Sequence, residues 1–181
     1  AAVLYIPFKL IELGIPLAQY LGVLLPFALL PFIFLPNLLG HWEDEMSNEK
    51  EILIFCLFGL IFSCVLFAFV ESTSLIVWAI VLFISRVFAS GAETSISSYL
   101  FKKITTADTA TISIFTSSTS VSYLLFTPMF AFLYSFANLE TLFLAVSFLL
   151  CFVLVLVSVI HDTKNYEKHK QWKEIWQKSY N

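Results

Sequence analysis

The sequence is poor in charge and in the side chains that most enzyme sites need. Charged residues make up 13% of the 181 positions, and the chain has only three histidines. It contains no HExxH pair, no Gly-rich phosphate-binding loop, no GxSxG and no paired intramembrane aspartates. A membrane metalloprotease, an ATPase and an intramembrane protease are therefore disfavoured, and an enzyme is the least favoured class.

Cysteine chemistry is also missing. Cys56, Cys64 and Cys151 all fall within apolar runs, where they act as small hydrophobic residues without a disulfide or metal spacing. The net charge is −3, and the basic residues gather at the ends of apolar segments rather than in one patch. We therefore expect no metal, no cofactor and no nucleic-acid partner.

Apolar residues are what the chain has in excess, at 59% of all positions with a mean hydropathy of +0.88. A soluble domain of this length could not bury so much apolar surface. Several runs approach the ~20 residues that cross a bilayer as a helix, and the short alternating segments of a β-barrel are absent. The sequence predicts an all-α polytopic membrane helix bundle, residues 1–161, with a tail at 162–181. The expected spans are about 15–39, 52–70, 74–100, 110–136 and 140–160.

The segment "AAVLYIPFKL" precedes these spans and has neither a Met nor the n-region of a signal peptide. We expect residues 1–13 to be a helix stub, with a turn at "GIP", and the chain to be a fragment that lacks an N-terminal half.

Lysines predict the topology, because cytoplasmic loops carry an excess of Lys and Arg. They lie in the loops 40–51 and 101–109 and in the tail, and five spans place these three segments on one side. We expect a multi-pass protein of the cell membrane with a cytoplasmic C-terminus. The tail alternates Trp and Tyr with Lys, which is typical of an interfacial amphipathic helix but equally of a solvated tail.

Polar residues concentrate in two neighbouring spans. Arg86, Ser90, Glu93 and Ser97 are spaced i, i+4, i+7, i+11, which places them on one face of the helix 74–100. The next span has the same spacing. Its polar residues are Thr116, Ser120, Tyr123 and Thr127. Since lipid would leave such stripes unsatisfied, they should face each other or a wet cavity.

The small and hydroxyl residues of the first stripe allow a second interpretation. Ser and Thr often serve close helix packing, and the stretch Ala89–Ala92 fits that role. Charges at a span centre are harder to explain by packing, because each costs at least ~2.5–3.5 kcal/mol on insertion scales. Arg86 and Glu93 therefore favour a functional stripe, although a buried structural network remains the alternative.

The first span is rich in proline, with Pro16, Pro26, Pro31 and Pro36. Each proline removes a backbone donor and bends a helix, which is typical of helices that move or line cavities. Gln19 and Tyr20 are its strongly polar side chains, near the outer end. Glu12 of the stub is a further candidate to face the same space.

Together these features resemble the C-terminal half of a major facilitator superfamily transporter. The stub, five spans and cytoplasmic tail correspond to the end of the seventh and the last five of twelve helices. The uncharged spans 52–70 and 140–160 correspond to the ninth and twelfth, which face lipid in that family. The loop "GHWEDEMSNEK" resembles the cytoplasmic signature G-x-L-A-D-x-x-G-R-K, with Gly40 and Asp44 at its Gly and Asp positions.

The resemblance implies that the seventh and tenth helices line a central cavity, with the eighth and eleventh beside them. Arg86 and Glu93 are then candidates for substrate or proton coupling, and Thr116, Ser120 and Tyr123 support the cavity wall. The favoured hypothesis is a secondary transporter of a small solute, working by alternating access with a proton or ion gradient. The alternative is a non-transporting scaffold or assembly subunit whose polar faces bind a partner helix.

Overall fold

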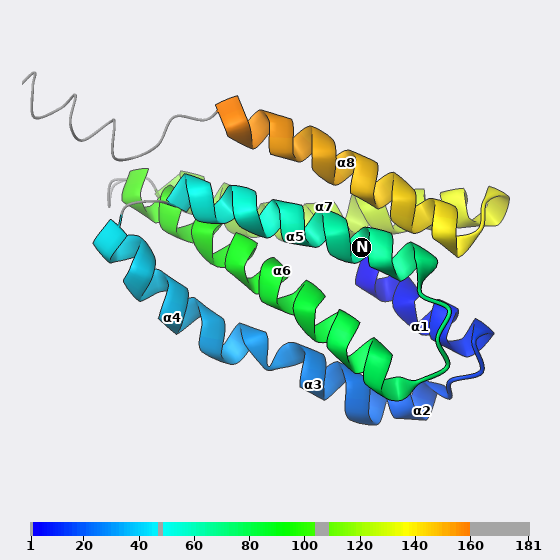
Figure 1. Cartoon of the computed structure of the whole chain (residues 1–181). Coiled ribbons are helices and arrows are strands. Elements are labelled where there is room, and N and C mark those ends of the chain that lie inside the picture. The colour runs from blue at the N-terminus through cyan, green and yellow to red at the C-terminus, as the bar shows by residue number, and fades with distance from the viewer. Residues whose placement is uncertain (1, 47–48, 104–108, 160–181) are drawn as a thin grey trace, which may run out of the picture.

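The computed structural model of the chain describes residues 2–46, 49–103 and 109–159, with side chains described for 5–40, 50–101 and 111–159. Every element in this part of the chain is a helix (Figure 1). The elements are α1 (Ala2–Glu12), α2 (Leu17–Gln19), the π-helix η1 (Tyr20–Leu24), α3 (Leu25–Leu29), α4 (Pro31–Met46), α5 (Glu49–Phe69), α6 (Leu75–Lys103), α7 (Thr109–Phe136) and α8 (Leu139–Val159).

Five segments are long and apolar enough to span a membrane. They are Leu17–Gly40, Lys50–Phe69, Leu75–Phe101, Thr111–Phe136 and Leu139–Val159. The predicted fold class, a polytopic bundle of membrane helices with an N-terminal stub, is thus confirmed. Gly14 has a φ of 81°, the left-handed conformation that lets the chain turn between α1 and α2.

Two loops are shorter in the structure than the sequence predicted. α4 continues through Met46 and α6 through Lys103, so the segments expected as loops at 40–51 and 101–109 are partly helical. The physical reason is that "HWEDEM" contains no proline or glycine to stop a helix, while Glu and Met are good helix formers. The change from apolar to polar residues at the end of each run therefore indicates where the hydrophobic span ends, and the helix itself continues further.

The first span is interrupted where its prolines lie. A π-helical turn covers Tyr20–Leu24 just before Pro26, and the chain breaks at Leu30 between α3 and α4. Leu30 N there bonds to Phe27 O at 3.3 Å, a tighter i to i−3 bond. Pro31 follows, which lacks an N–H, so the regular bond cannot form. The bends predicted from the prolines are therefore present.

α5 packs between α6 and α8, and glycines make its contact with α6 close. A methyl group built on Gly59 would collide with the ring of Phe88, and one on Gly91 would lie 2.6 Å from the Sγ of Cys56. Ala92 is buried in the same region, in one apolar cluster with Cys56. Small residues on α6 thus do serve close packing, as the second interpretation of that stretch required, and they serve it toward α5.

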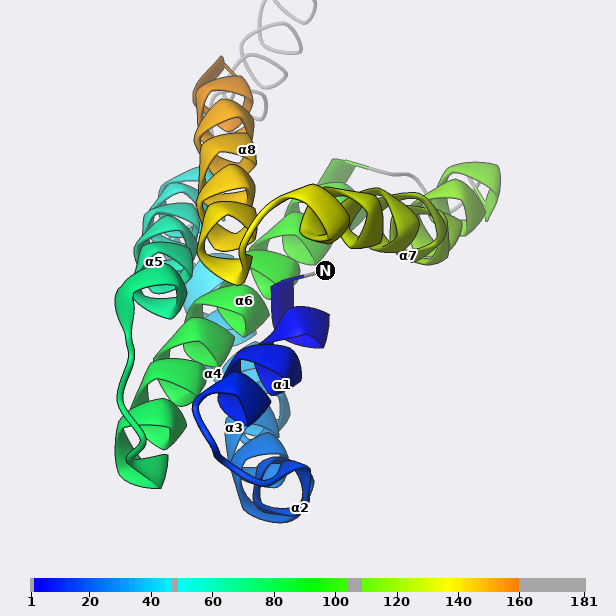
Figure 2. The same ribbon diagram turned by 90° about the vertical axis from the view of Figure 1, so that its right-hand side faces the viewer.

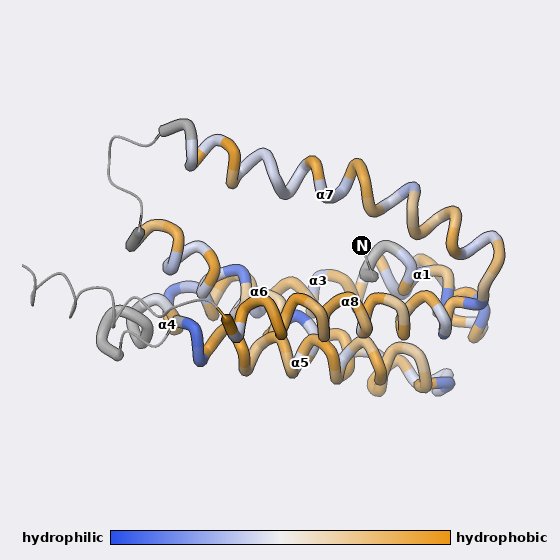
Figure 3. Tube along the Cα trace, turned by 90° about the horizontal axis from the view of Figure 1, so that it is seen from above, coloured by the Kyte–Doolittle hydropathy of each residue, from blue (hydrophilic) through white to orange (hydrophobic). Residues whose placement is uncertain are grey.

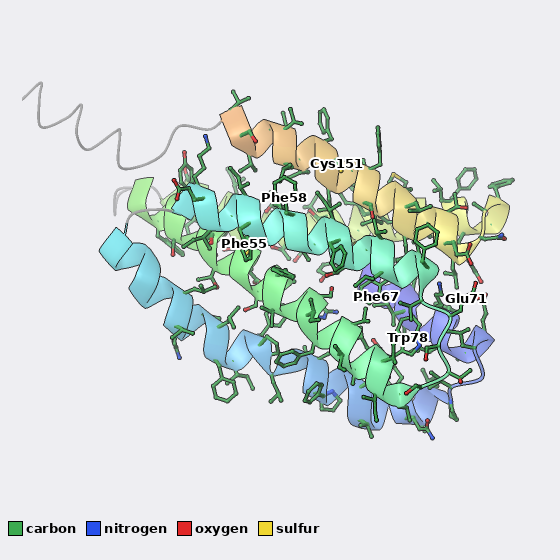
Figure 4. All side chains as sticks on the ribbon, in the orientation of Figure 1. Phe55, Phe58, Phe67, Glu71, Trp78 and Cys151 are labelled. Carbon is green, nitrogen blue, oxygen red and sulfur yellow. The ribbon has the colours of Figure 1, made fainter. Side chains whose placement is uncertain are left out.

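α5 also has an exposed face. Phe55 and Phe58 are 68% and 56% exposed and lie along α5 (Figure 4). The opposite face is buried, and at its C-terminal end Phe67 stacks on Trp78 with ring centres 6.3 Å apart (Figure 4). α5 is therefore lipid-facing on one side, as its uncharged composition allows, and packs against α6 and α8 on the other.

α7 stands apart from the other helices along most of its length. Two views at right angles to that of Figure 1 place it away from α6, and it approaches α1 and α8 at its C-terminal end (Figures 2 and 3). Two bonds join it to α1: Tyr5 Oη donates to Thr127 O at 3.0 Å, and Tyr134 Oη donates to Glu12 Oε1 at 3.3 Å. The interfacial helix expected in the tail lies outside the described residues.

Candidate functional site

A cavity of about 560 Å³ lies between α4 and α6. The residues that line it are Phe32, Pro36, Gly40, Ser90, Glu93, Thr94, Ser97, Ser98 and Phe101. α4 supplies the apolar wall and α6 supplies a carboxylate and four hydroxyl side chains. A solute in this space would therefore meet one charged, hydroxyl-rich side and one aromatic side.

Three members of the predicted α6 stripe line this cavity. Glu93 is exposed, and Ser97 is partly buried beside it. Ser90 is 1% exposed and its Oγ donates to Pro31 O at 3.4 Å, which ties the stripe to the start of α4. The helical spacing therefore did place these side chains on one face, and that face is turned toward α4.

Arg86 lies one turn before Ser90, against the same helix. Its Cζ is 6.0 Å from the centre of the Phe32 ring, within the range of a cation–π contact. Its Nε is buried and, among the residues that the structure describes, has no hydrogen-bond partner. The rise of a helix puts Arg86 and Glu93 about 10 Å apart along the axis, too far for an ion pair.

The α7 stripe does not pair directly with the α6 stripe, which corrects one of the two arrangements expected from the sequence. Thr116, Ser120 and Tyr123 are all exposed, and Thr116 Oγ1 donates within its own helix, to Ile112 O at 3.0 Å. Polar spacing could not reveal that α6 would turn its stripe to the proline-rich span instead.

Glu12 and Gln19 lie elsewhere. Glu12 accepts the bond from Tyr134 in a separate polar pocket, which also contains Lys9 and Glu140 at the end of the bundle where α7 meets α8. Gln19 is exposed on α2, in the half of the first span that does not line the cavity. Neither residue lines the cavity beside the α6 stripe.

The two motif residues fall on α4. Gly40 lines the cavity. Asp44 is part of the same helix, and its side chain is outside the described part of the chain. The motif expected in a loop is thus helical here.

Phe32 was not among the site residues predicted from the sequence, and Tyr20 was noted only as a polar side chain of the first span. An aromatic residue in an apolar, proline-rich span is expected to face lipid. Phe32, which lies between Pro31 and Pro36, instead makes a cation–π contact with Arg86. Tyr20 is 4% exposed in the same span. A buried arginine needs such neighbours, so the first span was the place to look for them.

These residues can bind a polar solute but form no catalytic set. The Glu93 carboxyl can accept hydrogen bonds in the cavity, the hydroxyls can donate and accept, and Arg86 carries guanidinium donors beside it, against Phe32. No group of three or more His, Cys, Asp or Glu side chains in the described residues is arranged to hold a metal ion.

Comparison with known proteins supports this interpretation of the fold. The sequence matches the Major Facilitator Superfamily over residues 2–179. Neither the curated proteins nor the solved structures gave a match. The family match covers nearly the whole chain, and the five membrane-spanning helices agree with it. The chain is therefore a multi-pass membrane protein that belongs to the Major Facilitator Superfamily, a family of membrane transporters.

Proposed function

We propose that this chain takes part in moving a small solute across the membrane by alternating access, coupled to a proton or other ion gradient. The observation that supports this most directly is the cavity between α4 and α6. It combines Glu93, a proton-binding group, with hydroxyl side chains, and Arg86 lies next to its aromatic wall. Ionisable groups inside a membrane bundle are costly and in general mark a solute or ion path.

The roles divide between the two charges. Glu93 is the coupling group, because it is open to the cavity and can exchange a proton with solvent there. Arg86 is the fixed positive charge, which holds an anionic part of the solute or balances Glu93 as it ionises. Ser90, Ser97 and their neighbours supply hydrogen bonds that orient the solute. Thr116, Ser120 and Tyr123 lie on α7, outside this cavity, and their role depends on what faces that helix.

The exposed face of α7 supports a partner of similar character. Thr116, Ser120 and Tyr123 are polar and exposed at the middle of a helix that must cross the bilayer. We propose that an N-terminal half of the same protein faces them and closes a water-filled path between the halves. A second candidate function rests on the same observation: a scaffold whose α7 face binds a helix of another membrane protein.

The proposed orientation in the cell membrane has a cytoplasmic C-terminus. Lys50, Lys102 and Lys103 lie at the end of the bundle where α8 also ends, and Lys50 Nζ donates to Ser158 O at 2.8 Å. Lys9 at the opposite end is 4% exposed. The lysine excess therefore lies at the end that is expected to be cytoplasmic.

The test is uptake by the full-length protein reconstituted into lipid vesicles, with a solute chosen by screening for gradient-driven accumulation. Glu93→Gln removes the titratable proton but keeps the shape of the side chain, so accumulation should fall to background. Glu51→Gln, on an exposed residue at the same end of the bundle, is the matched control and should transport normally. Normal accumulation in Glu93→Gln would remove this residue from the mechanism.

A further inference from the structure

One aromatic ring belongs to both parts of the candidate site. Phe32 lines the cavity together with Glu93. The same ring lies 6.0 Å from the Cζ of Arg86, which is not among the residues that line the cavity. Phe32 therefore lies at the boundary between the cavity and the guanidinium.

Arg86 has binding capacity that its neighbours do not use. Its Nε is buried and has no hydrogen-bond partner among the described residues. A ring face gives a cation less than a carboxylate does, and a guanidinium matches carboxylate and phosphate with two parallel bonds. The contact with Phe32 is thus one that an anion can replace.

The helical hydrogen-bond pattern is interrupted on both sides of Phe32. Pro31 begins α4 directly after the break at Leu30. Pro36 stands four residues after Phe32 and has no N–H, so the helical bond to the Phe32 carbonyl cannot form. A residue placed between two such defects can shift its side chain without breaking a regular hydrogen-bond ladder.

We propose that Phe32 is a gate over Arg86, and that the anionic group of a solute, a carboxylate or a phosphate, displaces the ring to bind the guanidinium. The ring holds Arg86 away from the cavity when the site is empty, and a neutral or cationic solute gains nothing by moving it. Phe32 therefore selects for anionic solutes. The selection deepens the proposed transport function and rests on it for the solute that is carried, but the binding step can be measured without transport.

The experiment places a thiol at the gate. Phe32→Cys is made in the full chain with the exposed Cys151 changed to Ser, and its reaction rate is measured in membranes with two thiosulfonate reagents. One reagent carries a sulfonate and the other a trimethylammonium group. We expect the sulfonate reagent to react roughly fivefold faster or more, the factor for about 1 kcal/mol between two unit charges in water. Arg86→Gln should abolish the preference.

Phe34→Cys is the position control, because Phe34 is 67% exposed on the same helix. Its rate ratio should not depend on Arg86. Acetate and inorganic phosphate are then added as protectants of Phe32→Cys, and the anion that slows modification identifies the carboxylate or phosphate class. Choline should give no protection. Protection by neither anion, or a rate ratio at Phe32→Cys that is unchanged by Arg86→Gln, overturns the proposal.

A second reporter covers the case in which Phe32→Cys does not reach the membrane. Thr94→Cys changes little in size, lies two turns from Arg86 on α6, is partly exposed and lines the cavity. Its preference for the sulfonate reagent should rise when Phe32 is shortened to Leu, and an unchanged preference overturns the gate. These rates do not depend on uptake, so a failed gate with Glu93-dependent transport is distinguishable from a failed transport function with an intact gate.

Discussion

The ammonium group of Lys9 donates a 2.8 Å hydrogen bond to the main-chain carbonyl of Phe67, and a second bond of 2.6 Å to that of Ala68. Both carbonyls lie at the C-terminal end of α5, where a helix leaves its last acceptors unsatisfied and attracts positive charge. Lys9 is 4% exposed. One buried lysine thus satisfies itself and the end of the central helix, and joins α1 to α5.

Replacing Lys9 should therefore destabilise the protein. In Lys9→Ala the two carbonyls lose their donor, and a buried group without a partner costs roughly 1–3 kcal/mol. We expect a loss of about 2 kcal/mol or more in the unfolding free energy of the purified full-length protein. Lys50→Ala removes a similar but exposed bond, to Ser158 O, and should cost well under half as much. Equal losses in the two variants would contradict this role for Lys9.

The close contact of α5 and α6 predicts a contrast between two glycines. A methyl group on Gly59 would enter the ring of Phe88, whereas one on Gly22 meets nothing within 4 Å. Overpacking typically costs about 1–3 kcal/mol, so Gly59→Ala should lower the melting temperature measurably. Gly22→Ala should leave it unchanged or raise it, because alanine favours a helix. A melting temperature for Gly59→Ala at or above that of the parent would exclude the tight contact.

The fold class could be predicted from composition because hydropathy and span length report directly on the membrane. The helix ends could not, since α4 and α6 continue beyond the apolar runs into polar sequence that also favours helix. Composition alone also does not decide how α5 packs. An uncharged helix can face lipid or pack centrally, and the contact of Gly59 with Phe88 is what decides it.

Part of the site could be predicted, namely the face that the α6 residues share, because that face follows from helix periodicity. Spacing of i, i+4, i+7 is enough to put Ser90 and Glu93 on one face, but it cannot name the helix opposite. Phe32 follows the break at Leu30 and lies 6.0 Å from the Cζ of Arg86, a contact that spacing within the α6 stripe could not indicate. Glu12 lies at the other end of the bundle, beside Tyr134.

The α7 stripe predicts a wet face in the middle of the membrane. With the native cysteines replaced by alanine, Ser120→Cys in the full-length protein should react with a water-soluble thiol reagent. Leu125, 61% exposed, lies about 140° around the helix and should face lipid, so Leu125→Cys should react at least roughly tenfold more slowly. Comparable rates at the two positions would mean that α7 does not border a water-filled path.

The proposed orientation predicts which end is reached from outside the cell. Asn138 lies between α7 and α8, and Glu51 lies at the start of α5, at the opposite end. In the same cysteine-free chain, Asn138→Cys should be labelled on intact cells by an impermeant reagent. Glu51→Cys should be labelled only after the membrane is opened. The reverse pattern would place the C-terminus outside.

The central claim is that Glu93 couples solute movement to a gradient, and one comparison in vesicles tests it most directly. The full-length protein and its Glu93→Gln variant are each assayed for gradient-driven accumulation and for exchange of labelled against unlabelled solute at zero gradient. A neutral amide can keep the cavity's shape and hydrogen bonds but cannot carry a proton. We predict that Glu93→Gln exchanges solute and does not accumulate it. Accumulation at the parent's level, with the gradient as its source, would contradict the account.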